Sequence, residues 1–567
     1  MKQFLIIFLF TTTITCFSQK KYPKNYFRNP LEIPTVLAGT FGELRSNHFH
    51  SGVDIKTQGK EGLKVFAAAD GYISRIKVAQ FGFGKALYIT HPNGYTTVYA
   101  HLSKYANKIE EYVKSIQYKK QNYQTGNIFL KKGKFSVKKG ELVAFSGDTG
   151  GSGGPHLHFE IRDTKTENII NPMFFGITSA DTKPPTIQSL LVYPLSFDAR
   201  INQQYNRYKV SVKNVGKGKY VGSRIFASGT IGFGINVFDR LNKANNKNGI
   251  YSLEMLVNGK RFYYHDVETF SFAESKYINL LIDYEYYKNY KSRVQKTYRV
   301  KENKLTIYKD LQNNGKIKIE KGLNYTIEII ARDFNGNKSS VKIPVVGKEN
   351  NTIFKKQKDT TAYKIVAKKF QKFTQDYVTI AFPKNTFYKD VYLDFKVDKG
   401  IANIHNPTIP LNKNFTLTFN VSKYSEEEKK HLYIANVQYA KYPRYQYTRK
   451  KDSTFYTTTK TLGKYKLLSD TKKPTIRLLY FKDKQWISSH KTLKVKIADA
   501  GSGIKNFRAT IDGQWVLMEY NHKKGILTYN FNDKKLVGSK HIFKIVVSDN
   551  VGNTKELSAT FFKKQVN

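Results

Sequence analysis

The sequence predicts an all-β protein with several domains. Stretches such as VYLDFKV (391–397) and FTLTFNV (415–421) alternate strictly between apolar and polar residues, which is typical of strands with one buried face. Asn-Gly and Asp-Gly pairs at 258–259 and 512–513 follow similar stretches, as expected for hairpin turns. Helical periodicity is scarce, and a chain of 567 residues is too long for a single hydrophobic core.

The first residues, MKQFLIIFLFTTTITCFSQ, have the layout of a secretory signal peptide, with Lys2, an apolar run from Phe4 to Phe10, and then small and polar residues. We expect residues 1–18 to direct export to the periplasm or cell envelope. The single cysteine, Cys16, lies in this leader, so a lipoprotein anchored through Cys16 is the alternative, although residues 13–15 fit a lipobox poorly. The apolar run is shorter than the ~20 residues that cross a bilayer, and no transmembrane segment is predicted.

The formal net charge of +51 raises the question of a nucleic-acid partner. The positive residues are mostly lysines at alternating strand positions, as in LKVKI (493–497), and they do not gather into one arm. We therefore interpret them as solvated strand faces and predict no specific nucleic-acid partner. Attraction to anionic envelope polymers, screened by salt, is the weaker expectation that remains.

The stretch from 30 to 178 differs from the rest because it is rich in glycine and histidine. In HFHSGVDIKT (48–57), an extended backbone puts His50, Gly52 and Asp54 on one face, and the glycine leaves a metal-sized gap between imidazole and carboxylate. One nitrogen and one oxygen ligand suit Zn²⁺, which does not require sulfur.

The segment ALYITHPNGYTTVYAHLS (86–103) predicts a hairpin that turns at Asn93 and Gly94. On its second strand, alternation places His101 on the same face as Tyr99. His91 comes directly before the turn, and we expect it at the surface.

In GGSGGPHLHFEIR (150–162), alternation puts His156, His158 and Glu160 on one face of a strand and apolar residues on the other. A catalytic zinc takes three protein ligands and keeps a position open. His50, Asp54 and one of the two strand histidines would complete that set. The other strand histidine, together with the hairpin histidine, would orient water or stabilise the transition state.

These motifs together resemble the lysostaphin/LytM family of zinc endopeptidases, which cut peptide cross-links in peptidoglycan. The resemblance covers HSGVDI, GLKVFAAADGYI, GFGKALYITHPNGYTTVYAHLS, VKKGELVAFSGDTGGSGGPHLHFEIR and INP, roughly a quarter of the chain, in family order. It implies an antiparallel β domain with a groove and one zinc ion per chain. It also implies that His50, Asp54 and His158 bind the metal and that His101 and His156 are the catalytic histidines.

The activity implied by the resemblance is zinc-dependent hydrolysis of peptidoglycan peptide cross-links by a metal-activated water. The alternative is a noncatalytic envelope protein whose LytM-like domain binds the wall or activates another hydrolase. Members of that kind lose zinc ligands, whereas all five positions are filled here. Residues 104–136 are longer than the usual family link and include a helical pattern over 106–120. This insertion could form a lid or specificity wall beside the groove, or it could be neutral surface.

Two junctions, DTKPP (181–185) and DTKKP (470–474), are followed by similar segments that end in ARDFNGN (331–337) and VSDNVGN (547–553). We therefore predict two divergent copies of one Ig-like β-sandwich, at 181–348 and 470–567, and a further β-sandwich-like domain at 349–469. We expect these domains to act as spacers or wall-binding units. An adhesin with an accessory peptidase is a third hypothesis.

Overall fold

The computed structural model describes residues 22–349 and 360–564. The predicted signal peptide and Cys16 lie outside these residues. Within them the chain is mostly β-structure, in several antiparallel sheets, as the sequence predicts. No helix in the described part is both long and apolar enough to cross a membrane.

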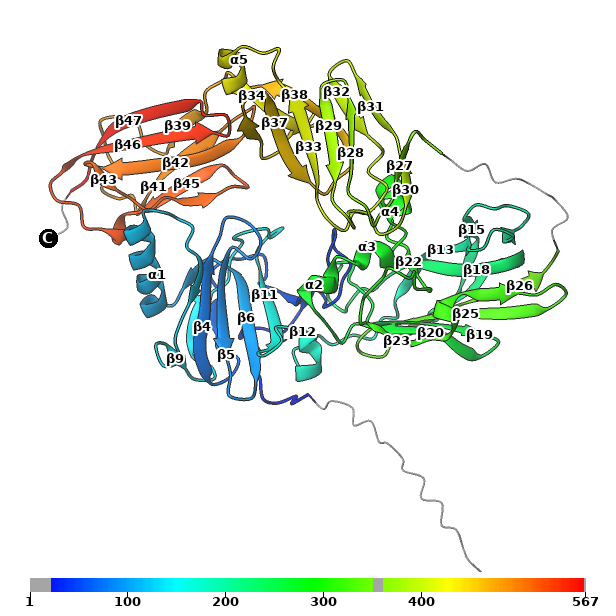
Figure 1. Cartoon of the computed structure of the whole chain (residues 1–567). Helices are drawn as coiled ribbons and strands as arrows, with labels where there is room; N and C mark the ends of the chain where they lie inside the picture. Colours follow the sequence, from blue (N-terminus) through cyan, green and yellow to red (C-terminus); the bar gives the residue numbers. More distant parts are fainter. Residues whose placement is uncertain (1–21, 350–359, 565–567) are drawn as a thin grey trace, which may run out of the picture.

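The first part of the chain builds a sheet in the order β1-β2-β11-β6-β5-β4-β8 (Figure 1). Its strands are β1 (Leu37–Gly39), β2 (Val53–Lys56), β4 (Gly71–Val78), β5 (Lys85–Thr90), β6 (Tyr95–Leu102), β8 (Gly126–Phe129) and β11 (His156–Asp163). The predicted hairpin is confirmed, because β5 and β6 are antiparallel neighbours. The central strand β11 separates β2 from β6, so the three histidine-bearing segments lie on adjacent strands.

The predicted helical pattern is also confirmed. Helix α1 (Asn107–Lys120) lies in the insertion 104–136, and it buries Ile109 and Val113 from the apolar side of the pattern. A small sheet beside it contains β3 (Lys64–Phe66), β7 (Lys104–Tyr105) and β10 (Leu142–Phe145).

The next part of the chain forms a sheet in the order β15-β13-β18-β26-β25-β19-β20-β23. These strands are β13 (Thr186–Pro194), β15 (Tyr208–Val210), β18 (Ile225–Phe238), β19 (Ser252–Val257), β20 (Lys260–Asp266), β23 (Tyr308–Leu311), β25 (Asn324–Arg332) and β26 (Lys338–Gly347). Three short helices, α2 (Phe272–Ser275), α3 (Ile278–Leu281) and α4 (Tyr284–Tyr290), interrupt it between β20 and β23.

Two further β units follow, each with two main sheets, and the first also has a two-stranded sheet of β27 (Tyr363–Ile365) and β30 (Val391–Leu393). The main sheets of the first unit have the orders β28-β29-β33-β37-β36 and β31-β32-β38-β34-β35, and those of the second have the orders β39-β41-β45-β44 and β40-β47-β46-β42-β43. Their shorter strands are β28 (Gln371–Gln375), β29 (Val378–Phe382), β31 (Phe395–Asp398), β32 (Ile401–Ile404), β35 (Arg444–Tyr445), β36 (Arg449–Lys451), β39 (Thr475–Leu479), β40 (Gln485–Trp486), β43 (Gln514–Trp515), β44 (Glu519–Asn521) and β45 (Ile526–Asn530). Their longer strands are β33 (Phe415–Asn420), β37 (Thr454–Thr459), β38 (Gly463–Ser469), β41 (Thr492–Ala498), β42 (Ile504–Ile511), β46 (Lys540–Asp549) and β47 (Thr554–Phe562). Helix α5 (Glu426–His431) precedes β34 (Leu432–Asn436). Buried apolar residues form one cluster within 365–467 and another within 481–561.

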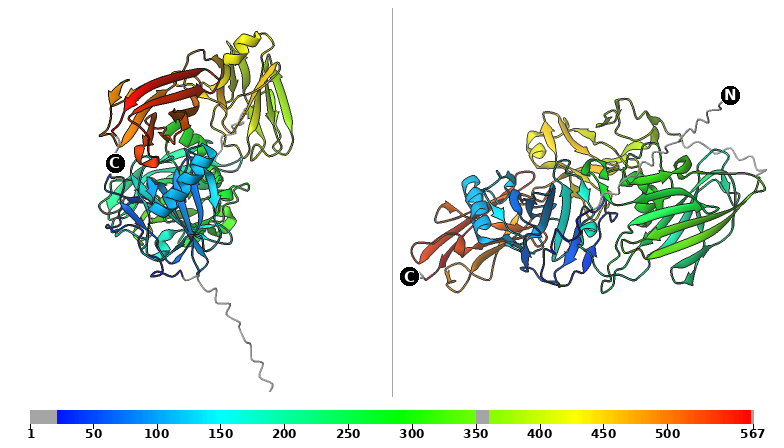
Figure 2. Two further views of the ribbon diagram at one scale, coloured as in Figure 1. Left: turned by 90° about the vertical axis from the view of Figure 1, so that its left-hand side faces the viewer. Right: turned by 90° about the horizontal axis from the view of Figure 1, so that it is seen from below.

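The last unit returns to the first (Figures 1 and 2). Lys114 on α1 lies 2.6 Å from Asp533, and the rings of Tyr118 and Trp515 pack edge to face with centroids 5.2 Å apart. The insertion 104–136 therefore provides a surface on which the last unit packs. Neither sequence expectation for this insertion, a lid or a neutral surface, anticipated that contact.

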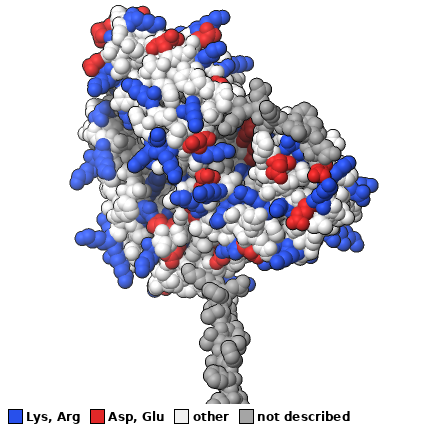
Figure 3. Space-filling view, turned by 45° about the vertical axis from the view of Figure 1, so that its right-hand side comes forward, with Lys and Arg blue, Asp and Glu red and all other residues white. Residues whose placement is uncertain are grey.

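Figure 3 shows one face of the molecule, on which Lys and Arg are scattered among fewer Asp and Glu. On that face the positive charge does not gather into one patch, in agreement with the interpretation of lysines as solvated strand positions.

Candidate metal centre

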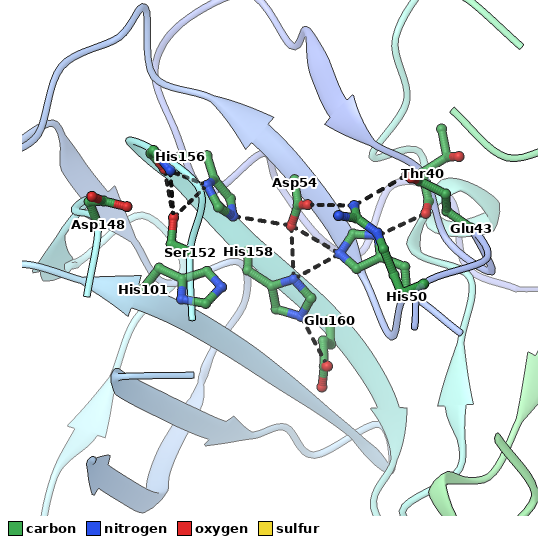
Figure 4. Close-up of polar contacts among 12 residues, drawn as sticks. Thr40, Glu43, His50, Asp54, His101, Asp148, Ser152, His156, His158 and Glu160 are labelled. Carbon is green, nitrogen blue, oxygen red and sulfur yellow. Dashed lines mark hydrogen bonds and ion pairs between the residues drawn. The ribbon is translucent and has the colours of Figure 1, made fainter. Parts of the chain in front are cut away.

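The pairing of β2 with β11 brings the expected metal ligands together. Asp54 pairs directly with His158, so the two side chains project from the same face. Asp54 Oδ1 lies 2.9 Å from His158 Nδ1 and 3.0 Å from His50 Nε2, and the two ring nitrogens are 3.2 Å apart (Figure 4). Ligands of a tetrahedral zinc ion with bonds of about 2.0 Å lie about 3.3 Å from one another, so these three atoms match that spacing.

The hydrogen bonds on the far side of each ring fix the tautomers of the two histidines. His50 Nδ1 donates to the backbone oxygen of Thr40 at 2.8 Å, and His158 Nε2 donates to Glu160 Oε1 at 3.0 Å. Both acceptors are oxygens without hydrogen, so in the neutral rings the lone pairs lie on the remaining nitrogens, His50 Nε2 and His158 Nδ1, and any proton on His158 Nδ1 must leave before a metal binds there. Two lone pairs and a carboxylate oxygen at these distances repel one another unless a cation lies among them, which fits a divalent metal.

The electrostatics of the centre support the same view. Burial alone would raise the pKa of Asp54, but the surrounding histidines outweigh it and hold this pKa well below its usual range. Burial would likewise lower the pKa of His158, yet hydrogen bonds to Asp54 and Glu160 raise it to about 9. In the absence of metal, a proton on His158 therefore supplies the positive charge, and a metal ion would displace it.

The sequence expectation for Gly52 is corrected. A Cβ atom at this position would lie 2.3 Å from the backbone oxygen of Phe159 and 3.0 Å from the His158 ring. Glycine is needed here because strand β11 approaches closely, and the histidine ring occupies the space that the sequence predicted to be a gap.

The two other histidines of the predicted site lie beside the metal ligands. The ring centroids of His101 and His156 are 4.9 Å apart, and His156 Nε2 lies 3.4 Å from Asp54 Oδ1. His101 Nδ1 donates to the backbone oxygen of Thr149 at 2.8 Å, and His156 Nδ1 donates to that of Gly154 at 2.8 Å. Both Nε2 atoms therefore carry lone pairs as well. Burial and the neighbouring histidines lower the pKa of His101 to about 3, so it is neutral at pH 7.

The prediction that His101 shares a face with Tyr99 is wrong. Tyr99 packs on Phe159 in the core, whereas His101 lies on the opposite face, 5.8 Å from the His158 ring. The backbone explains this difference, because the β5–β6 register shifts at this point and His101 has a φ of 60°. Such a bulge re-aims a side chain, which is common beside active sites.

His91 is also not where the sequence suggested. It is 3% exposed, with Nδ1 bonded to the Asp70 backbone oxygen and Nε2 to Thr97 Oγ1, both at 2.8 Å. His48, in contrast, is exposed, and its ring bonds to the Ser46 backbone oxygen.

Three polar residues of the centre received no role from the sequence. Glu160 is fully buried and joins His158 to Arg162, whose guanidinium lies within 2.7 Å of Glu160 Oε2. Arg45 Nη2 lies 3.2 Å from Asp54 Oδ2, the carboxylate oxygen that does not contact His50 or His158. Strand alternation had placed Glu160 on the histidine face, so a signal for it existed. No sequence pattern identified Arg45, which lies outside a regular strand.

Comparison with known proteins identifies domain families in two parts of the chain. The profile described as Peptidase family M23 matches residues 48–118 and 117–172, and the profile of the Zu5-like domain matches residues 362–470. The chain thus contains an M23 peptidase domain of the lysostaphin/LytM type in its N-terminal region and a Zu5-like domain further towards the C-terminus. The Zu5-like match refines the sequence prediction of a β-sandwich-like domain at 349–469.

Individual relatives cover only parts of the chain. An "Uncharacterized metalloprotease" of Haemophilus influenzae is 31% identical over 28% of this chain and 30% of its own length. The "DD-carboxypeptidase/endopeptidase Mpg" of Neisseria meningitidis serogroup B is 35% identical over 21% of each chain. The solved catalytic domain of the antimicrobial peptidase lysostaphin from Staphylococcus simulans is 26% identical, covers 24% of this chain and 87% of that chain, and has a TM-score of 0.18. The chain spans less than a third of the length of these two curated relatives.

Proposed function

We propose that this protein is a zinc-dependent endopeptidase that hydrolyses peptide cross-links of peptidoglycan. The observation that carries the proposal is the convergence of His50, Asp54 and His158, with three donor atoms 2.9 to 3.2 Å apart, beside the second pair His101 and His156. The names of relatives support the substrate class, since the Neisseria protein is a DD-carboxypeptidase/endopeptidase and a Vibrio cholerae relative is a peptidoglycan DD-endopeptidase.

In this proposal His50, Asp54 and His158 hold one zinc ion per chain. The bound ion would supply a Lewis acid for the scissile carbonyl and for the attacking water. The protein prepares these ligands through their other atoms: Thr40 fixes the ring of His50, Glu160 fixes that of His158, and Arg45 holds the second oxygen of Asp54. The ligand atoms therefore need little reorganisation on binding.

His101 and His156 would handle the proton. Each has its Nδ1–H held by a backbone oxygen, which leaves Nε2 free to accept a hydrogen from the attacking water. The low pKa of His101 keeps this nitrogen available at neutral pH. Once protonated, either imidazole becomes a donor that can stabilise the oxyanion of the tetrahedral intermediate and protonate the leaving amine.

The remaining expectations belong to the same proposal. The chain would be exported by its first 18 residues and act in the periplasm or cell envelope, attracted to anionic polymers by its charge. Residues 30–178 would form the peptidase domain, followed by domains at 181–348, 349–469 and 470–567, the first and last of them Ig-like. Clusters of buried apolar residues within 187–345, 365–467 and 481–561 support the last three domains, whereas the first cluster, mostly from 27–177, also includes Leu241, Ala244 and Leu517.

The proposal is tested with purified chain lacking residues 1–18. We expect about one zinc per chain by elemental analysis and the release of cross-link fragments from peptidoglycan, identified by mass spectrometry. The His50→Ala variant should lose both zinc and cleavage, whereas His101→Ala should keep zinc and lose most cleavage. His48→Ala is the matched control, because this exposed histidine does not contact the centre, and it should behave like the wild type.

Two outcomes would contradict the proposal. Cleavage by the His50→Ala variant would remove the metal assignment. The noncatalytic alternative would be favoured if the wild-type protein binds zinc, releases no fragments when it acts alone, and stimulates another hydrolase.

A further inference from the structure

A second group of metal-binding character lies away from the histidine centre. Asp181 follows the peptidase region, Asp239 follows strand β18 directly, and Asp333 follows strand β25 directly. One carboxylate oxygen from each residue lies within 4.8 Å of the others. The three residues are 7%, 1% and 4% exposed. Three acidic side chains are therefore buried together at the start of the second β unit.

The charges of this group are poorly compensated. Asp181 Oδ2 and Asp239 Oδ1 are buried and have no hydrogen-bond partner. Burial and the neighbouring aspartates raise the pKa of Asp239 to about 7. Burial, again with a contribution from Asp181, raises that of Asp333 to about 6. Lys183 lowers the pKa of Asp239 but does not offset the burial. Buried carboxylates with so little counter-charge are costly, so the fold either keeps protons on them or places a cation among them.

An uncharged side chain at the same place points to a cation. Asn248 is 2% exposed, and neither its side-chain oxygen nor its nitrogen has a hydrogen-bond partner. Its backbone pairs with that of Asp239 through two hydrogen bonds of 2.8 and 3.0 Å. Residues directly opposite in an antiparallel pair share a face, so the Asn248 amide lies on the same side as the Asp239 carboxylate. A buried amide is normally satisfied, and this one offers an oxygen to a ligand in the group.

We propose that Asp181, Asp239 and Asp333, with the amide oxygen of Asn248, form a Ca²⁺ site. All of these donors are oxygens, which Ca²⁺ prefers, and the group contains neither the nitrogen nor the sulfur donors typical of zinc sites. Two oxygens bound to one Ca²⁺ at about 2.4 Å lie at most about 4.8 Å apart. The three carboxylate oxygens of this group all lie within 4.8 Å of one another. Two of the four proposed ligands, Asp239 and Asp333, line a cavity of about 10 Å³.

The location gives the site a structural role. Its cavity is also lined by Thr40 and Asn171 of the peptidase region. Thr40 Oγ1 accepts a hydrogen bond from the backbone N–H of Gly249, which is next to Asn248. The backbone oxygen of Thr40 accepts the hydrogen bond from His50 Nδ1. A cation here would stabilise the contact between the second unit and the peptidase domain, close to Thr40, the residue that orients the metal ligand His50.

The last β unit repeats much of the arrangement with Asp470, Asp499 and Asp549. In each group the first aspartate accepts a hydrogen bond of 3.2 Å from the backbone N–H of the lysine two residues later. In each, an asparagine four residues after the last aspartate donates its side-chain N–H to that carboxylate at 2.7 Å. Because Asp499 is partly exposed, the proposal is confined to the first group.

To test the proposal, the zinc-loaded chain is freed of other divalent ions and is then titrated with Ca²⁺ in a calorimeter. We expect Asp239→Asn to lose one equivalent of bound Ca²⁺, or to bind it at least tenfold more weakly, and to lose the rise in Tm that Ca²⁺ gives the wild type. The exposed Asp198→Asn is the control in the same unit and should match the wild type. Any Ca²⁺ held by the Asp470 group is unaffected by these substitutions.

Asp333→Asn provides a second variant should the first fail to fold, and its circular dichroism is compared with that of the wild type. The proposal is overturned if the wild type binds no Ca²⁺ at 5 mM, if it binds Mg²⁺ but not Ca²⁺, or if both folded variants bind as many Ca²⁺ ions as the wild type with the wild-type affinity. None of these readouts depends on peptidase activity, so the outcome is independent of the proposed function.

Discussion

Glu160 is the residue whose removal tests how the metal centre is built. Its Oε1 accepts the Nε2–H of His158 at 3.0 Å, and its Oε2 accepts two hydrogen bonds from Arg162 at 2.7 and 2.5 Å. Although burial opposes it, Arg162 and His158 lower the pKa of Glu160 to about 2, so the carboxylate stays ionised. One side chain thus fixes the tautomer of a metal ligand and neutralises a buried arginine.

Glu160→Gln keeps one oxygen and turns an N–H₂ group either towards His158 or towards Arg162, so it must lose one of the two contacts. We expect zinc affinity to fall roughly tenfold in Glu160→Gln and roughly 100-fold in Glu160→Ala, which has no acceptor. These losses correspond to about 1.4 and 2.7 kcal/mol. In Glu160→Ala, unfolding should also become easier by about 3 kcal/mol, because Arg162 keeps only one ion pair, the 2.7 Å contact to Glu167.

Zinc affinity is measured by competition with a chromogenic chelator, and the free energy of unfolding by urea titration. Glu167→Gln is the matched control, because Glu167 also bonds to Arg162 but does not contact His158. It should lose some stability and keep the wild-type zinc affinity. The reasoning is refuted if folded Glu160→Ala binds zinc as tightly as the wild type, or if the control loses as much affinity as the Glu160 variants.

Three other substitutions test separate parts of the structure. Burial lowers the pKa of His91 to about 4, below the value of about 6.5 in an unfolded chain, so stability falls as pH drops and about 2 kcal/mol is lost by pH 5. In urea titrations at pH 7 and pH 5, the stability lost between the two pH values should be about 2 kcal/mol smaller in His91→Gln than in the wild type. An equal loss in both proteins would contradict the burial argument. Gly52→Ala puts a Cβ 2.3 Å from the Phe159 oxygen and should abolish zinc binding, measured by elemental analysis, whereas retained zinc would show that β11 can move away. Glu519→Gln leaves the ammonium of Lys85 without its counter-charge and should lower unfolding stability by about 1 to 3 kcal/mol in calorimetry; no change would mean that the contact is unimportant.

Much of the candidate centre could be predicted from the sequence, because strand alternation is a local property. The period of two placed His156, His158 and Glu160 on one face of a strand. In the structure both histidines contact Asp54, and Glu160 contacts His158 on the same face of β11. Resemblance to a family then distinguished His158 from His156, a choice that the residues alone left open. In the structure His158 is indeed the closer of the two to Asp54, at 2.9 Å against 3.4 Å.

Alternation failed where the backbone leaves the regular strand. His101 lies opposite its predicted face because a residue with positive φ and a register shift interrupt the period of two. No glycine or proline at this position signals the bulge. His91 was misplaced for another reason: the turn residues that follow it predicted exposure, whereas packing on Phe27 at 5.2 Å covers its ring.

Short helices were missed although their start signals are present. Ser271 and Glu274 form a complete capping box at the start of α2, and Ser425 and Glu428 form another at the start of α5. Helices of four and six residues are too short to show an apolar period of 3.6, so only the capping pattern could have identified them.

Lys85 shows most clearly what sequence periodicity cannot reach. A lysine in a strand is expected to face solvent, yet Lys85 is 3% exposed, with its Nζ 2.9 Å from both the Ser103 backbone oxygen and Glu519 Oε1. Its counter-charge comes from a residue 434 positions away, and although burial opposes it, Glu519 raises the pKa of this lysine. Lys85 begins the strand that pairs with the one bearing His101, and its partner in that pairing is Leu102. The last unit of the chain therefore stabilises the strand edge from which a proposed catalytic histidine projects, and the peptidase region cannot be understood from its own sequence alone.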